Sequence, residues 1–165
     1  MVRAEQAGDE AAISAVHRAA FAGQPYSNQL EHRIVERLRE RGKLVLSLVS
    51  VNESGEVAGH VAFSPVLVDG ADLGWVGLGP VGILPEYQRR GLGSELIETG
   101  LATLRAAGVA GCVVFGDPAY YERFGFRSGT GLSYPGAPPG YFMALSFSPA
   151  PPPFGSVSYD DPFSD

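Results

Sequence analysis

The chain has 165 residues, of which 45% are apolar and 18% charged, values typical of a single soluble domain with a hydrophobic core. Its formal net charge of −6 argues against a nucleic-acid partner and mildly favours a cationic or amine-bearing one. A single cysteine excludes an internal disulfide and fits a reducing, cytoplasmic location. The sequence has neither a signal pattern at its start nor an apolar run that could span a bilayer, so no membrane partner is expected.

Two amphipathic helices are expected in the N-terminal part. The first follows Asp9, which can cap it, and the second follows Ser27 or Asn28 and ends at Gly42. Apolar residues recur at helical spacing, at Ile13, Val16, Ala20 and Phe21 in the first helix and at Leu30, Ile34, Val35 and Leu38 in the second. His17 lies beside the first apolar stripe, where a packing or surface role is favoured over a role as a ligand.

A meander of antiparallel strands is expected next. The β-branched and leucine-rich residues 44–51 lead through turn residues 52–55 into a partner strand that starts near Glu56 and reaches Val68. The following strand, residues 75–84, is interrupted by Gly77, Gly79, Pro80 and Gly82. Glycine or proline inside a strand marks a bulge or a place where another molecule approaches the backbone. We therefore expect this strand to be irregular.

The loop after this strand is the most informative stretch. The strand stops at Pro85, and the sequence Gln88-Arg89-Arg90-Gly91-Leu92-Gly93 leads into a helix that begins at Ser94 and closes at Gly108. A loop of this kind directs free N–H groups and the positive end of the helix dipole to one place, which suits a phosphate. It is not a P-loop, because no Gly-Lys-Ser/Thr follows, and it lacks the third glycine of a dinucleotide-binding fingerprint.

A second strand–helix unit follows. The short apolar run of residues 111–115 predicts a buried strand that is parallel to residues 75–84 and connected to them by a right-handed crossover. Asp117 and Pro118 predict the start of a short helix, because proline fits the first helical position. This helix is expected to run toward Gly125.

The last part of the chain is rich in turns. Residues 128–140, which include Tyr134 and three prolines, indicate a partly rigid and aromatic pocket wall, and residues 141–147 predict a final strand. Residues 149–165 are proline-rich and then acidic. They are either docked on the domain or partly disordered.

Several motifs together resemble one superfamily. Residues 88–93 match the Gln/Arg-x-x-Gly-x-Gly/Ala pyrophosphate loop of the Gcn5-related N-acetyltransferase (GNAT) superfamily, which follows a bulged strand and opens a helix. Residues 120–126 resemble the Tyr-x-x-x-Gly-Phe segment of that superfamily. Gly-His-Val-Ala-Phe-Ser-Pro-Val at 59–66 and Gly-Asp-Pro-Ala-Tyr-Tyr at 116–121 are similar to a group of bacterial predicted acetyltransferases. The likeness is close along residues 59–126 and thinner elsewhere.

The resemblance implies a fold and an activity. The fold would be the α/β (α+β) GNAT fold over residues 1–148, with residues 149–165 as a proline-rich acidic tail. Its central sheet would be mixed and mostly antiparallel, with a bulged strand splayed from its parallel neighbour and about four flanking helices. The activity would be acetyl transfer from acetyl-CoA, without a metal, to the primary amine of a small molecule or peptide by direct attack in a ternary complex. The alternative is a non-catalytic acyl-CoA-binding sensor or accessory domain, and either would be a monomer or a homodimer.

The resemblance also implies a donor site. The residues that it assigns to acetyl-CoA are Val81, Gly82 and Ile83 of the strand, Gln88, Arg89, Arg90, Gly91, Leu92, Gly93 and Ser94 of the loop, and Tyr121. A backbone N–H at Gly82 or Ile83 would bind the oxyanion of the tetrahedral intermediate. Tyr121 would act as general acid toward the CoA thiolate. For Tyr120, a position as a core aromatic residue is favoured.

The general base is less well determined. Glu31 lies on the second helix, which in this superfamily borders the acceptor pocket, although a solvated helix face is the favoured interpretation for it. Asp117 is expected mainly to cap the helix that Pro118 opens. His60 alternates with Val61 and either faces the cleft or packs in the core. The acceptor itself would be selected by the first two helices and the turn-rich stretch, whose sequence does not identify it.

Overall fold

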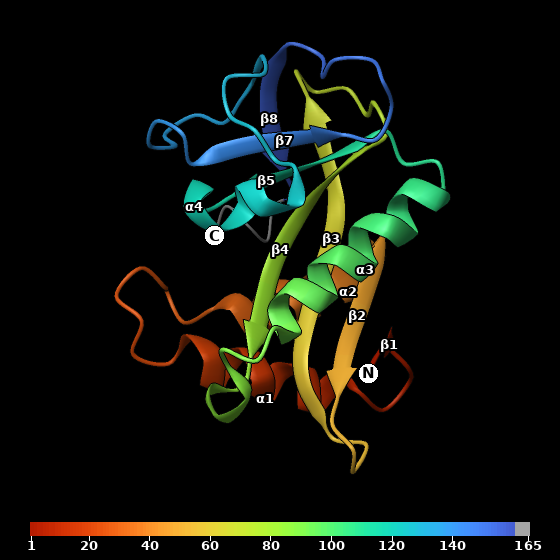
Figure 1. Cartoon of the computed structure of the whole chain (residues 1–165), viewed down its shortest axis with the longest axis vertical. Coiled ribbons are helices and arrows are strands. Elements are labelled where there is room, and N and C mark those ends of the chain that lie inside the picture. The colour runs from red at the N-terminus through yellow and green to blue at the C-terminus, as the bar shows by residue number, and fades with distance from the viewer. Residues whose placement is uncertain (161–165) are drawn as a thin grey trace.

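An open sheet of eight strands organises residues 1–160, the part of the chain that this computed structural model describes (Figure 1). The elements in chain order are β1 (Val2–Ala4), α1 (Glu10–Phe21), α2 (Glu31–Glu40), β2 (Leu46–Val51), β3 (Val57–Val68), β4 (Trp75–Ile83), η1 (Pro85–Tyr87), α3 (Leu92–Ala106), β5 (Gly111–Phe115), α4 (Pro118–Tyr121), η2 (Glu122–Phe124), β6 (Leu132–Ser133), β7 (Phe142–Ser146) and β8 (Gly155–Tyr159). The main path of the sheet is β1-β2-β3-β4-β5-β7, and β8 pairs with β3 and β6 beside it. Only β4 with β5 and β6 with β8 are parallel among these pairs of described strands, so the expected mixed, mostly antiparallel sheet is confirmed.

The predicted interruption of β4 is a bulge. Val61 of β3 lies opposite Val81, but Phe63, two residues further along β3, lies opposite Leu78, so β4 carries one extra residue at this place. The parallel pairing with β5 covers only Trp75–Gly77 of β4. Beyond the bulge the two strands diverge, as Figure 1 shows. The sheet is therefore open between β4 and β5 on the C-terminal side of the bulge.

The two faces of the sheet carry different layers. On one face α3 packs against a core that includes Phe63, Leu96 and Ile97. On the other face α1 and α2 cover one part of the sheet, where Ile13 packs on Ala62, and β8 with the segment around β6 covers the rest. None of the helices among residues 1–160 combines the length and the apolar character needed to cross a membrane.

Two predicted helix caps are wrong. Asp9 lies at the N-cap position of α1, but its side chain does not cap the helix and accepts hydrogen bonds from Arg3 and the Gln6 N–H instead, at 2.7 Å each. In α2 the N-cap residue is Leu30, beyond Ser27 or Asn28, and no side chain caps this end. The pattern of capping residues therefore located both helices and the start of α1, but it placed the start of α2 too early and predicted side-chain caps that neither helix has.

Proline at position 65 does not interrupt β3, which runs unbroken from Val57 to Val68. The Val45 N–H donates to the Phe63 carbonyl oxygen at 2.9 Å, and backbone groups two residues apart on a strand point to the same side. The nitrogen of Pro65 therefore points past the end of β2, where no ladder hydrogen bond is lost. One strand consequently links the α1 region to the β8 region.

The C-terminal segment contributes a strand that its sequence did not predict. In β8, Val157 is 2% exposed and lies opposite Val68 of β3. Asp160 accepts an ion-pair contact from Arg41 at 2.8 Å. Residues 155–160 are thus docked on the sheet, whereas the acidic end of the predicted tail, residues 161–165, lies outside the described residues.

Truncation of Val157 to alanine should destabilise the fold by about 2 kcal/mol, because it removes two buried methyl groups and leaves a small cavity. Ser158→Ala, on the exposed side of the same strand, is the matched control and should change stability by less than about 0.5 kcal/mol. Urea unfolding of both variants measures the difference. Equal stabilities would mean that β8 does not contribute to the folded core.

Candidate active site

The predicted anion loop forms a cavity at the N-terminus of α3. Gly91 is the N-cap residue of α3, has a positive φ of 81°, and no side chain among the described residues caps this end of the helix. The first N–H groups of α3 have no partner within the helix. They point, with the positive end of the helix dipole, into a space that an anion can fill.

This donor cavity has a volume of about 360 Å³. Its walls are Ile83, Tyr87, Gln88, Arg89, Gly91, Leu92, Gly93, Ser94, Tyr120 and Arg123. Most of the residues predicted for the loop therefore meet in one cavity. Arg90 is not among its walls, and its guanidinium lies 5.4 Å from the centre of the Tyr87 ring.

Three wall residues were not predicted, namely Tyr87, Tyr120 and Arg123. The Tyr120 ring packs against the core, as expected, but its hydroxyl reaches the first turn of α3, 3.4 Å from Ser94 Oγ. The Arg123 guanidinium lies 4.5 Å from the centre of the Tyr120 ring and adds a positive charge at the cavity. In the sequence, the spacing of three residues between Tyr120 and Arg123 could have indicated that both lie on one helical face.

The backbone of β4 next to the donor cavity has an unpaired edge. The Leu84 N–H donates to the Ala58 carbonyl oxygen at 2.9 Å, and Gly82 lies opposite His60 in the same register. Because hydrogen-bonded pairs alternate along antiparallel strands, the N–H of Gly82 points toward β3 and those of Val81 and Ile83 point away from it. In agreement, the Ile83 carbonyl oxygen accepts a hydrogen bond from the Gln88 side chain at 3.0 Å.

This alternation refines the sequence interpretation of the oxyanion donor. The sequence pointed to the N–H of Gly82 or Ile83, and the strand pairing turns the Gly82 group into the sheet. On the open side, pairing with β5 ends at Gly77 within the described residues. Val81 and Ile83 are therefore the residues with backbone groups available to a ligand.

Tyr121 is not among the wall residues of the donor cavity. It packs against Gly116, where a Cβ atom would collide with its ring. The Tyr121 ring also meets the Phe126 ring edge-on, with 6.1 Å between the centroids. Burial, followed by smaller effects of Tyr120 and Cys112, raises the pKa of Tyr121 above its usual value. Its hydroxyl is protonated at neutral pH, as that of an ordinary tyrosine is, and the raised pKa makes it a weaker proton donor.

The structure places the three candidates for the general base in different surroundings. Asp117 caps α4 as predicted, accepting a hydrogen bond from the Ala119 N–H at 2.9 Å. Glu31, at the start of α2, accepts from Ser27 Oγ, which lies 2.7 Å from both of its carboxylate oxygens. His60 is fully buried and hydrogen-bonded to His17. Within residues 1–160, no three His, Cys, Asp or Glu side chains are grouped so that they could hold a metal ion.

A second cavity of about 340 Å³ lies where β4 and β5 begin to separate. Its walls are Leu78, Gly79, Pro80, Phe115, Tyr134 and Tyr159. The Tyr134 ring meets the rings of Phe115 and Tyr159 edge-on, at centroid distances of 5.9 and 5.3 Å. The predicted aromatic wall from the turn-rich stretch is therefore part of a pocket beside the bulge, on the face of the sheet opposite α3.

Comparison with known proteins identifies the family. A model of the acetyltransferase (GNAT) family matches residues 11–126. The uncharacterized N-acetyltransferase YhbS of Escherichia coli strain K12 is 42% identical over 127 residues, which are 77% of this chain and 73% of the relative.

Two crystal structures agree with this relation. A GNAT family acetyltransferase from Brucella melitensis, in complex with acetyl-CoA, has 48% sequence identity and a TM-score of 0.88, with 99% of this chain and 97% of that chain covered. YhbS from Escherichia coli, in complex with CoA, has 35% identity and a TM-score of 0.90, with 100% and 92% covered. The chain therefore belongs to the GNAT family of N-acetyltransferases.

Proposed function

We propose that this N-acetyltransferase moves the acetyl group of acetyl-CoA to the primary amine of a small molecule or peptide by direct attack in a ternary complex. The observation that carries the proposal is the continuity between the donor cavity at α3 and the unpaired edge of β4, with Ile83 belonging to both. The acetyl-CoA complex of the relative from Brucella melitensis supports the same donor here.

Two parts of acetyl-CoA would bind this surface, the pyrophosphate and the pantetheine arm. Its pyrophosphate would accept hydrogen bonds from the first N–H groups of α3, from Gly91 to Ser94, with Arg89 and Arg123 at the cavity wall. Its pantetheine arm carries amides, which would hydrogen-bond the N–H groups of Val81 and Ile83 and the C=O group of Val81 as an added strand does. The thioester would then lie near the bulge, between β4 and Tyr121.

The chemistry needs an oxyanion donor and an outlet for the thiolate. The N–H of Val81 or Ile83 is a preorganised dipole directed at the open edge, where the tetrahedral oxyanion would form. Tyr121 would give its proton to the departing sulfur. Because a thiol with a pKa near 8.5 is already a tolerable leaving group, this proton is worth only about 10²-fold in rate.

The second cavity is the best place for the acceptor. It adjoins the bulge at Gly79 and Pro80 from the face opposite α3, so an acceptor bound there would approach the thioester without crossing the donor cavity. Its aromatic and apolar walls favour an acceptor whose amine is carried on an apolar or aromatic body. The negative net charge of the chain mildly favours a cationic amine.

A thiol-release assay tests the function. Acetyl-CoA is incubated with the enzyme and, in turn, 2-phenylethylamine, spermidine, amino acids and lysine peptides, and free CoA is measured. Release that depends on the amine supports the proposal. Tight binding of acetyl-CoA without amine-dependent release would favour the sensor alternative.

Replacement of Gly91 by valine should weaken acetyl-CoA binding about tenfold or more. The left-handed backbone at Gly91, with a φ of 81°, costs a β-branched residue about 1–2 kcal/mol, so the loop would give up the conformation that directs its N–H groups inward. Gly108→Val is the matched control, because Gly108 has a similar φ of 85° after the opposite end of α3. Calorimetry should show comparable destabilisation of both variants but lost affinity only for Gly91→Val.

Tyr121→Phe should lower kcat by up to about 10²-fold while leaving the KM for acetyl-CoA nearly unchanged, because only the proton donor is removed. Phenylalanine keeps the ring that packs on Gly116 and Phe126, so the melting temperature should change little. Steady-state kinetics between pH 6 and pH 9 provide the measurement. A kcat equal to that of the wild type over this range would remove Tyr121 from the mechanism.

A further inference from the structure

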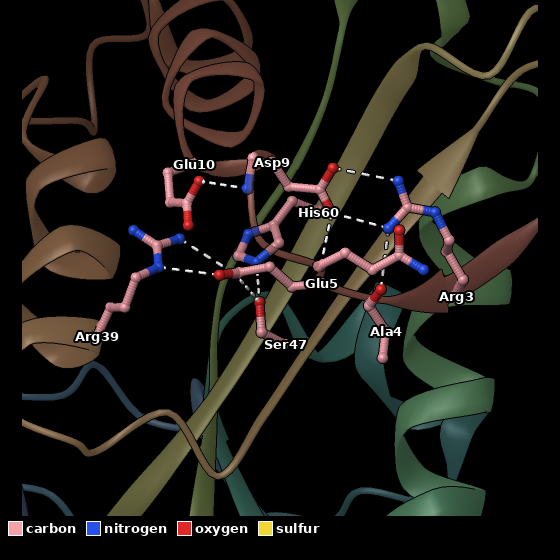
Figure 2. A network of polar contacts seen from close by, with 10 residues as sticks. Arg3, Ala4, Glu5, Asp9, Glu10, Arg39, Ser47 and His60 are labelled. Carbon is pink, nitrogen blue, oxygen red and sulfur yellow. Dashed lines mark hydrogen bonds and ion pairs between the residues drawn. The ribbon is translucent and has the colours of Figure 1, made fainter.

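A chain of hydrogen bonds runs along the α1 side of the sheet, from His17 of α1 past β3 and β2 to Glu5. His17 Nε2 lies 2.8 Å from His60 Nδ1, and His60 Nε2 lies 2.7 Å from Ser47 Oγ. Ser47 Oγ in turn donates to a Glu5 carboxylate oxygen at 2.6 Å. Figure 2 shows the outer part of this chain, in which Glu5 also pairs with Arg39 at 2.9 Å.

The carboxylate fixes the direction of every bond in this chain. The ion-paired Glu5 accepts hydrogen bonds, so Ser47 uses its only proton toward Glu5 and must accept from the Nε2–H of His60. Burial lowers the pKa of both histidines, that of His60 to about 3, so both rings are neutral. A neutral His60 that is protonated on Nε2 has a bare Nδ1, which accepts from the Nε2–H of His17. The remaining nitrogen, His17 Nδ1, is left with a free lone pair.

This lone pair is buried and faces β4. His17 is 1% exposed, and its Nδ1 has no hydrogen-bond partner among residues 1–160. A Cβ atom on Gly82 would lie 2.9 Å from Nδ1, so the ring approaches the strand only because residue 82 is glycine. A buried polar nitrogen without a partner carries a cost of about 1–3 kcal/mol. Its retention next to the proposed reaction centre points to use by a substrate.

The lone pair and the second cavity share one face of β4. Pro80, a wall of that cavity, precedes Gly82 by two residues, which corresponds to about 7 Å along a strand. On β3, Val66 packs with Tyr159, and Ala62 packs with α1. Both residues are even-numbered, so they lie on the same face of the strand. An amine beside Pro80 would therefore lie on the same side of β4 as His17 Nδ1, about 7 Å away along the strand.

We propose that His17 is the general base of the acetyl transfer and accepts the amine proton at Nδ1, while His60, Ser47 and Glu5 are positioning residues that keep the proton of the ring on Nε2. The inference rests on the proposed function. As the amine nitrogen bonds to the acetyl carbon, its proton passes to His17 Nδ1. The C–S bond then breaks, and the sulfur takes the proton of the Tyr121 hydroxyl. Water returns the proton from His17 to Tyr121 after the products leave.

A weak base is sufficient for this step. Burial lowers the pKa of His17 well below its usual value, and the neighbouring His60 and His32 lower it further. For His60, burial and Arg39 act in the same direction and Asp9 opposes them. The protonated nitrogen of the tetrahedral intermediate is more acidic than the protonated free amine, so a weaker base can take its proton. His17 thus stays neutral wherever the amine is partly neutral, and the acid limb of the rate profile should report the acceptor rather than the imidazole.

Imidazole ¹⁵N NMR of the whole protein tests the arrangement without any substrate. Wild-type His17 and His60 should both be neutral and protonated on Nε2 between pH 6 and pH 8. Ser47→Ala removes the acceptor of the His60 proton and should give mixed tautomers at both rings, and Ser47→Thr, which keeps the hydroxyl, should restore the wild-type pattern. A wild-type His17 that carries its proton on Nδ1, or on both nitrogens, would overturn the proposal.

Steady-state kinetics test the role of His17 as general base. They use an amine from the thiol-release assay that the wild-type enzyme acetylates. His17→Gln should lower kcat about 10²-fold with an unchanged KM for acetyl-CoA, and Ser47→Ala about tenfold, with rescue by Ser47→Thr. Ser64→Ala, which removes a buried hydroxyl elsewhere on β3, is the control and should match the wild type. Full activity in both His17→Gln and Ser47→Ala, or a loss of activity found in Glu31→Gln instead, would refute the base assignment. If the wild-type enzyme acetylates none of the amines, the proposed function itself is refuted, and not this inference alone.

Discussion

The separation of β4 from β5 is the constraint on which the site depends. Backbone N–H and C=O groups inside a protein need partners, and a sheet normally supplies them from the next strand. Here parallel pairing ends at Gly77, and one extra residue at the bulge turns the rest of β4 away from β5. Val81 and Ile83 are left with groups that a ligand with amides can satisfy as a strand would. The N-terminus of α3 lies at the end of this edge and can bind an anion.

The alternation of β4 gives its two faces different tasks. Odd-numbered residues beyond the bulge face α3, and Ile83 belongs to the donor cavity there. Gly82 faces α1, where the absence of a side chain admits the His17 ring. Gly77 likewise makes room for neighbouring side chains, because a Cβ atom there would meet Tyr159 and Val66. Two of the glycines that interrupt this strand therefore make room for side chains of the protein itself, and not for a ligand.

Local sequence predicted the elements whose signals are local. The spacing of apolar residues located α1 and α2, and the Asp117-Pro118 pair located α4 together with its cap. Elements as short as β1, with three residues, carry no periodicity to read. The strand β8 was missed because it is stabilised by β3, about 90 residues earlier in the chain, and not by its own pattern. The order and spacing of the glycine loop and the tyrosine segment were sufficient to identify the family.

The sequence alone thus predicted the anion-binding loop, because such a loop is built from consecutive residues whose backbone conformation their own glycines permit. It did not predict the surroundings of His17. His17 and His60 are 43 residues apart, and each taken alone is an ordinary packing histidine. Only the register of β2, β3 and β4 lines them up with Ser47 and Glu5, and only the pairing of β4 shows which backbone groups remain free. Such relations depend on which strands become neighbours, and this is decided when the sheet assembles.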